Sequence, residues 1–99
     1  EEINMKTIRT QSINKASYVT IATGYEAEVI WQGEWNYFHF PKEKNVEEEF
    51  NRFEDAVKRR KRLDIDLVAF MRAVKGYREE IWKAKLKVNN EGQDNESNK

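Results

Sequence analysis

Two runs of alternating side chains with a short connection between them constrain the fold of this chain most strongly. Residues 25–31 and 35–40 are rich in aromatic and β-branched residues and flank a connection at residues 32–34. A short connection that contains a glycine, here Gly33, is typical of a β-hairpin. Pro41 ends the second run because proline has no N–H for a sheet ladder. The sequence therefore predicts an antiparallel hairpin.

The alternation also assigns the two faces of the hairpin. Glu26 and Glu28 favour water, which turns the residues between and after them toward the core. The predicted inner face consists of Ala27, Val29, Trp31, Phe38 and Phe40. The predicted outer face consists of Ile30, Trp35, Tyr37 and His39, with Arg9 beside them. Exposed aromatic side chains favour a protein interface, burial under the last helix or the tail, or contact with DNA, and the nearby carboxylates favour the interface.

The first quarter of the chain predicts a strand and a helix. Residues 6–10 alternate and are rich in β-branched side chains, which suits a short edge strand. A helix is predicted over residues 13–23, where Thr10 or Ser12 can accept a backbone N–H at its start. Gly24 follows the last turn and can adopt the left-handed conformation that ends a helix.

The second half of the chain predicts two helices joined by a short break. Asn45 with Glu48 predicts a capping box at the start of the first helix, and Asp64 or Asp66 can cap the second. The apolar stripe of the first helix is Val46, Phe50, Phe53 and Val57. The stripe of the second is Leu67, Phe70, Val74, Tyr77 and Ile81, opposite Arg72, Lys75, Glu79 and Lys83. We expect Phe70 at the centre of the core and fraying of this helix between residues 83 and 88.

The predicted order is strand, helix, strand, strand, helix, helix. Two helices joined by a few residues and accompanied by a hairpin are typical of a winged helix-turn-helix, although the hairpin here precedes the helix pair. We therefore predict one α+β, winged helix-turn-helix-like domain over residues 5–88. Met5 suggests that residues 1–4 are a flexible remnant. Residues 89–99 have no apolar side chain, which predicts a disordered acidic and polar tail.

The charged side chains balance overall but are unevenly distributed. The chain has 18 basic and 18 acidic side chains, and eleven of the basic ones lie between residues 58 and 87. The run KRRKR at residues 58–62 has more cations than a helix end needs to complement its dipole, so it favours phosphate contacts over a merely solvated terminus. The predicted DNA-binding residues are Thr7, Arg9, Thr10, Gln11, Lys58, Arg59, Arg60, Lys61, Arg62, Arg72 and Lys75.

Several classes of function are excluded by what the sequence lacks. It has no cysteine, and His39 is its one histidine, so zinc fingers, disulfide scaffolds and thiol catalysis are excluded and no metal site is expected. It has no phosphate-binding glycine loop and no nucleophile motif, so no enzyme, cofactor or small-molecule substrate is expected. No apolar run approaches the roughly 18 residues of a membrane span, and a cytoplasmic location is the expectation.

One spacing pattern covers about residues 6–82. It combines an Arg-Thr strand end, a small residue in a helix, a glycine stop, an aromatic strand and a final helix with an aromatic residue and a lysine. Its residues are Arg9, Thr10, Ala16, Gly24, Phe38, His39, Phe40, Phe50, Phe53, Ile65, Asp66, Phe70 and Lys75. The pattern resembles a family of small proteins of unknown function from phages, plasmids and other mobile elements.

The chain as a whole also resembles conjugation accessory proteins of the TcpK type from clostridial plasmids, which are winged-helix dimers that bind DNA near the origin of transfer. The resemblance implies a small accessory protein of a mobile element that binds duplex DNA as a homodimer, in plasmid transfer or in transcriptional control. The alternative is a protein-interaction module, such as a phage-encoded inhibitor, that uses the aromatic face and leaves the basic run as a solubility feature.

Overall fold

A computed structural model describes the backbone of residues 7–97 and the side chains of residues 7–87. The elements in chain order are β1 (Thr7–Thr10), α1 (Ile13–Thr23), β2 (Glu28–Gln32), β3 (Trp35–Pro41), α2 (Lys44–Arg59) and α3 (Leu67–Ser97). This α+β order is the predicted one. Residues 1–4, expected to be a flexible remnant, lie outside the described residues. No helix within residues 7–97 combines the length and the apolar character needed to span a membrane.

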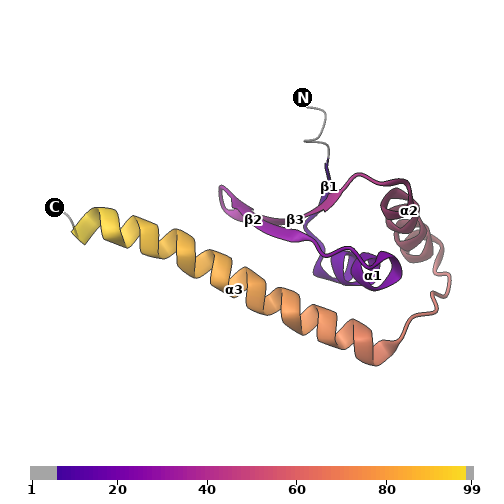
Figure 1. Cartoon of the computed structure of the whole chain (residues 1–99). Helices are drawn as coiled ribbons and strands as arrows, with labels where there is room; N and C mark the ends of the chain where they lie inside the picture. Colours follow the sequence, from indigo (N-terminus) through magenta and orange to yellow (C-terminus); the bar gives the residue numbers. More distant parts are fainter. Residues whose placement is uncertain (1–6, 98–99) are drawn as a thin grey trace.

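The sheet has three antiparallel strands in the order β1-β3-β2 (Figure 1). Gln32 pairs with Trp35 across a two-residue turn, so β2 and β3 form the predicted hairpin. Gly33 has a φ of 66° in this turn, a positive value that a first turn residue of type II′ requires and that glycine adopts without strain. β1 pairs with the other edge of β3, where Arg9 lies opposite His39.

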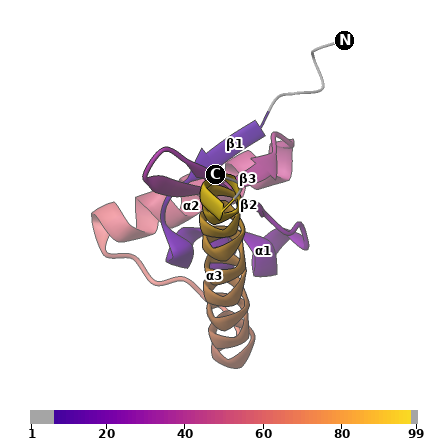
Figure 2. The ribbon, with the colours of Figure 1, turned by 90° about the vertical axis from the view of Figure 1, so that its left-hand side faces the viewer.

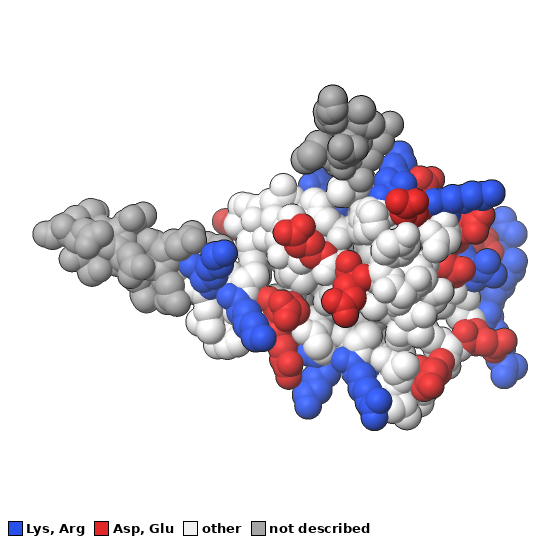
Figure 3. Space-filling view, in the orientation of Figure 1, with Lys and Arg blue, Asp and Glu red and all other residues white. Residues whose placement is uncertain are grey.

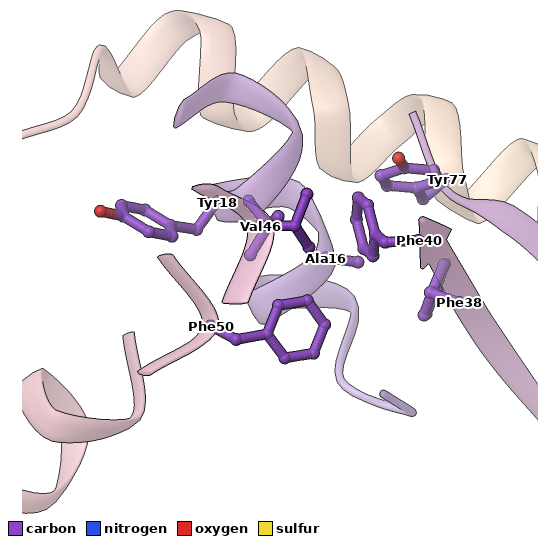
Figure 4. Packing of buried hydrophobic residues seen from close by; sticks show 8 residues of the cluster. Ala16, Tyr18, Phe38, Phe40, Val46, Phe50 and Tyr77 are labelled. Carbon is purple, nitrogen blue, oxygen red and sulfur yellow. The ribbon is translucent and has the colours of Figure 1, made fainter. Parts of the chain in front are cut away.

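All the core helices pack on one face of this sheet. The buried cluster joins Ala16 and Val19 of α1 to Phe38 and Phe40 of β3, and it includes residues of α2 and α3 (Figure 4). In Figure 2, α3 crosses in front of α1 and α2 lies on the left. The predicted inner face is therefore confirmed at Phe38 and Phe40, which are fully buried.

Two aromatic contacts of β3 hold the other helices to the sheet. The rings of Phe40 and Phe50 meet edge to face with centroids 5.7 Å apart, which joins α2 to the sheet. The rings of Phe38 and Tyr77 meet in the same way at 5.1 Å, which joins α3. Edge-to-face pairs of this kind stabilise a core beyond the burial of their area.

α1 is the central helix and is buried continuously from residue 15 to residue 19. Ser12 caps its start by accepting the N–H of Lys15 at 3.1 Å, and Gly24 ends it with a φ of 85°. The buried Lys15 forms an ion pair with Glu54 of α2. Tertiary packing of this extent compensates for the weak helix propensity of the β-branched residues in α1.

The hydroxyl of Tyr77 connects three elements. It accepts the backbone N–H of Ala27, just before β2, at 2.8 Å. It also shares a hydrogen bond of 2.5 Å with the hydroxyl of Thr20 in α1. Since Tyr77 belongs to α3, one side chain fixes the position of this helix relative to both α1 and the hairpin.

The structure corrects two sequence-based assignments in α2. This helix begins at Lys44 with Glu43 as its N-cap, and no side chain accepts a hydrogen bond there. The predicted capping box of Asn45 and Glu48 is therefore wrong, because the helix starts before Asn45 can occupy the cap. The predicted apolar stripe is also wrong at Val57, which is 65% exposed. α2 turns the small side chain of Ala56 toward the core instead.

Two further corrections concern α3. Leu67 is 65% exposed because it belongs to the first turn, before the helix reaches the core. Phe70 is only half-buried, and the centre of the stripe is instead Tyr77, whose ring contacts Phe38. A helix axis that is inclined to the sheet brings one turn of the stripe into the core, and sequence periodicity does not specify which turn that is.

The packing of the last two helices also differs from that of the predicted helix pair. α2 and α3 each pack extensively on α1, which lies between them, rather than on one another. α3 continues as a helix to Ser97 and passes the segment at residues 83–88 where fraying is predicted. Residues 89–97 of the predicted disordered tail belong to this helix, and residues 98–99 lie outside the described residues.

We predict that Tyr77→Phe lowers the free energy of unfolding by about 1–3 kcal/mol, because the N–H of Ala27 loses its acceptor. Chemical denaturation measures this loss. Tyr25→Phe is the matched control, since Tyr25 is exposed and exposed substitutions change stability by about 0.5 kcal/mol or less. Equal stabilities of the two variants would show that water replaces the Tyr77 hydroxyl.

Candidate nucleic-acid interface

The basic run lies where α2 ends and the following loop begins. Lys58 and Arg59 form the last turn of α2, and Arg60 is the C-cap in a left-handed conformation with a φ of 56°. The backbone N–H of Lys61 donates a hydrogen bond to the carbonyl of Ala56 at 2.9 Å. All five basic side chains of the run are exposed. Figure 3 shows Lys and Arg side chains interspersed with Asp and Glu at the right-hand end of the molecule, where α2 ends in Figure 1.

Asp55 neutralises part of this positive charge. Its carboxylate accepts from Arg59 at 3.0 Å and from Lys61 at 3.1 Å. The hydrogen bond from Lys61, followed by the charge of Arg59, lowers the pKa of Asp55 below its ordinary value. Arg62 lies 4.0 Å from Asp64. Among the described residues, Lys58 and Arg60 form no ion pair.

The first turn of α1 lies between basic side chains of the two other helices. A surface groove on one side of it is lined by Thr10, Ser12 and Lys58, and by Lys15 with the Glu54 carboxylate that neutralises it. A second groove, on the other side, is lined by Asn14, Lys75 and Arg78 with apolar residues of α3. The positive end of the α1 dipole therefore lies between Lys58 and the pair of Lys75 and Arg78, an arrangement that favours anions.

We define the basic surface by this arrangement. It consists of Thr10, Gln11, Ser12, Asn14, Lys58, Arg59, Arg60, Lys61, Arg62, Lys75 and Arg78. The fold thus groups Thr10, Lys58 and Lys75, which are distant in sequence. Asn14 is a member that the sequence analysis missed, although its place two residues after the N-cap Ser12 was a usable signal.

Other predicted DNA-binding residues lie elsewhere. Arg72 lines a groove with three carboxylates, those of Glu26, Glu28 and Glu80, so its surroundings are acidic. Thr7 and Arg9 are exposed on the face of the sheet that carries no helix. The structure thus places Thr7 and Arg9 on the opposite face from Thr10, because successive residues of a strand point to opposite faces.

The outer sheet face is a second candidate surface, and it consists of Thr7, Arg9, Glu28, Ile30, Gln32, Trp35, Tyr37 and His39. The guanidinium of Arg9 lies 4.4 Å from the centre of the Tyr37 ring and donates to Gln32 at 2.9 Å, so it crosses the central strand. Trp35 is 62% exposed. The alternative that α3 covers this face is wrong, because α3 packs on the inner face through Tyr77.

A polar cavity of about 570 Å³ lies next to the basic run. Lys61, Arg62 and Arg52 line it together with Asp55, Glu49 and the Tyr18 hydroxyl. Tyr18 donates to Glu49 at 2.6 Å, and burial, followed by this carboxylate, raises the pKa of Tyr18 to about 12. Three carboxylates, those of Glu49, Asp55 and Asp64, line the cavity with its three cations, so it does not form an anion site. Within the described residues, no three side chains gather as metal ligands either.

Comparison of the chain with protein-family models, with curated proteins and with solved structures finds no match in any of the three. The two candidate surfaces are therefore interpreted from their own geometry.

We predict that the free energy of unfolding falls as the pH rises from about 10 to about 12. The folded protein keeps the proton of Tyr18 up to a pH of about 12, whereas the unfolded chain releases it near the ordinary value of 10.0. The stabilisation is complete below pH 10 and is lost as the pH rises through this window. Tyr18→Phe should show a shallower dependence in denaturation experiments, and identical slopes would contradict the assignment.

Proposed function

We propose that the protein binds duplex DNA through phosphate contacts at the basic surface. The observation that supports this most directly is the first turn of α1 between Lys58 of α2 and Lys75 and Arg78 of α3. Backbone N–H groups at a helix start and flanking ammonium or guanidinium groups are both suited to phosphate oxygens. Displacement of counterions by these cations then supplies much of the affinity.

The burial of α1 limits how the duplex is approached. Residues 15–19 are buried, so α1 cannot lie along a groove, and only its first turn is available to DNA. Contacts made by this turn and by the basic run position the protein on the backbone. Gln11, exposed just before the turn, is the side chain best placed for a closer contact with a groove.

We propose that two copies associate through the outer sheet face. Glu28 on this face and Glu34 in the hairpin turn oppose phosphate, whereas Trp35, Tyr37 and Ile30 offer apolar area to a protein. Arg9 is already fixed over Tyr37, which reduces the ordering that association requires. A dimer presents two basic surfaces to one duplex, and the second contact is then intramolecular.

The wider part of the proposal rests on the resemblance described above. It interprets the fold as winged-helix-like, with the β2–β3 hairpin as the wing, and the protein as a cytoplasmic accessory factor of a mobile element in plasmid transfer or transcriptional control. The permuted order, with the hairpin before α2 and α3, distinguishes it from the usual arrangement. Neither a cofactor nor a small-molecule substrate is part of this function.

A protein-interaction module is the second candidate. The exposed Trp35 next to Glu34, with Glu28 further along the same face opposite His39, favours it, since an aromatic face with carboxylates suits a basic protein partner. An electrophoretic shift with duplex DNA at two salt concentrations separates the candidates. Retention that weakens with salt supports DNA binding, and no retention at low salt supports the interaction module.

We predict that replacing Arg59, Arg60 and Arg62 together by Gln weakens DNA binding without unfolding the protein. The three side chains are exposed, so the melting temperature should change by only a few degrees. The dependence of log affinity on log salt should become shallower by about 0.9 for each phosphate that the variant no longer neutralises. An unchanged affinity would remove the basic run from the interface.

Asp55→Asn is the matched variant, and we expect it to change the affinity for DNA in the opposite direction. It releases Arg59 and Lys61 from the carboxylate that now pairs with both. DNA binding should strengthen and its salt dependence should steepen, because more cationic charge is free for phosphate. Weaker binding would mean that Asp55 positions these side chains for the duplex rather than competing with it.

We predict that Trp35→Ser with Tyr37→Ser yields a folded monomer that binds DNA more weakly. Sedimentation and DNA titration measure the two effects together. Trp82→Ser is the control, because Trp82 is as exposed as Trp35 but lies on α3, and it should leave the dimer intact. If the double variant is still dimeric, the interface lies elsewhere. If it is unfolded, the two rings belong to the core.

A further inference from the structure

α3 has a second stripe of side chains, directed away from the core. Five of the eight large apolar side chains that are exposed in the described part of the chain belong to this helix. Four of the five recur at helical spacings that place them on one face. We define the outer stripe of α3 by the side chains Val68, Met71, Lys75, Arg78, Trp82 and Leu86.

The apolar members of the stripe are too exposed for a surface that only contacts water or DNA. Val68, Met71 and Trp82 are each close to 60% exposed, at 57%, 59% and 59%. Exposed apolar side chains that recur at both ends of one helix face mark a protein contact, whereas DNA interfaces are more polar. The heptad-like spacing of the stripe fits a second helix better than a loop or a sheet.

The centre of the stripe is cationic. Lys75 and Arg78 lie between Met71 and Trp82, and with Glu79 and Lys83 they line a shallow groove beside the Trp82 ring. Their aliphatic stems can pack against a partner while the charged ends stay at the edge. The partner therefore needs apolar side chains at both ends of the contact and negative charge in its middle.

This charge pattern argues against a second copy as the occupant of the stripe. In a parallel pair of α3 helices in register, Lys75 would face its own counterpart. In an antiparallel pair centred on the stripe, Lys75 would face Arg78 of the other copy. Either arrangement places like charges opposite each other, which destabilises a helix pair.

We propose that the outer stripe of α3 binds an amphipathic helix of another protein, one whose apolar seam is interrupted at its centre by two carboxylates. This function is additional to the proposed DNA binding. Because Lys75 and Arg78 also belong to the basic surface, such a helix and the duplex compete for the same two cations.

The probe is a synthetic helical peptide of three heptads with leucine at its core positions, except for glutamate at the two central ones. The control peptide has lysine at those two positions. Fluorescence anisotropy of the labelled peptides is measured against the full chain without DNA. We expect the glutamate peptide to bind at least about ten-fold more tightly than the lysine peptide, a difference of about 1.4 kcal/mol.

Three variants locate the contact, and circular dichroism confirms that each is folded. Lys75→Glu with Arg78→Glu should reverse the preference between the two peptides. Trp82→Ser should weaken binding of the glutamate peptide about ten-fold, as expected for an aromatic anchor. Trp35→Ser, on the outer sheet face, should leave it unchanged.

The proposal is overturned by equal affinity for the two peptides, by failure to bind either, or by loss of binding in Trp35→Ser. It is also overturned if sedimentation shows that Trp82→Ser, and not the Trp35 and Tyr37 double variant, dissociates a dimer, because the occupant is then a second copy. DNA binding is titrated separately. A chain that binds the glutamate peptide but no DNA contradicts only the proposed function, and the reverse result contradicts only this inference.

Discussion

The position of every helix depends on the inner face of the central strand, β3. Phe38 contacts Tyr77 and Phe40 contacts Phe50, so neighbouring inward positions of one strand hold α3 and α2 respectively. The Tyr77 hydroxyl extends the same contact to α1 and to the segment before β2. A small domain has few buried side chains with which to fix its elements. Here the two-residue period of a strand distributes them between two helices.

The same period keeps the two proposed surfaces apart. Outward residues of the sheet meet no helix, so aromatic side chains remain available there, whereas the inward residues gather the helices whose ends carry the basic residues. A substitution on the outer face should therefore leave the packing that places Lys58 near α1 unchanged, and it would affect the proposed DNA binding only through the proposed self-association. α3 differs, because Lys75 and Arg78 belong both to the basic surface and to its outer stripe.

Local chemistry made much of this fold predictable. The turn at Gly33, the stop at Gly24 and the cap at Ser12 each act over a few residues, and the structure has all three. The inclination of α3 to the sheet was not predictable from the sequence. That inclination decides which turn of its apolar stripe reaches the core, and it brings Tyr77 rather than Phe70 to the centre. The basic run was evident from composition. That Asn14 lines one groove with Lys75 and Arg78 depends on the packing of α1 against α3, which the sequence does not specify.

The left-handed C-cap at Arg60 has a consequence for how this sequence can change. A side chain with a β-carbon is strained by roughly 1–2 kcal/mol in that conformation, which is why glycine and asparagine are common at helix ends. Selection for thermal stability alone would replace this arginine, and each such replacement would remove a cation. Arginine retained at position 60 in homologues would therefore indicate selection for positive charge against stability.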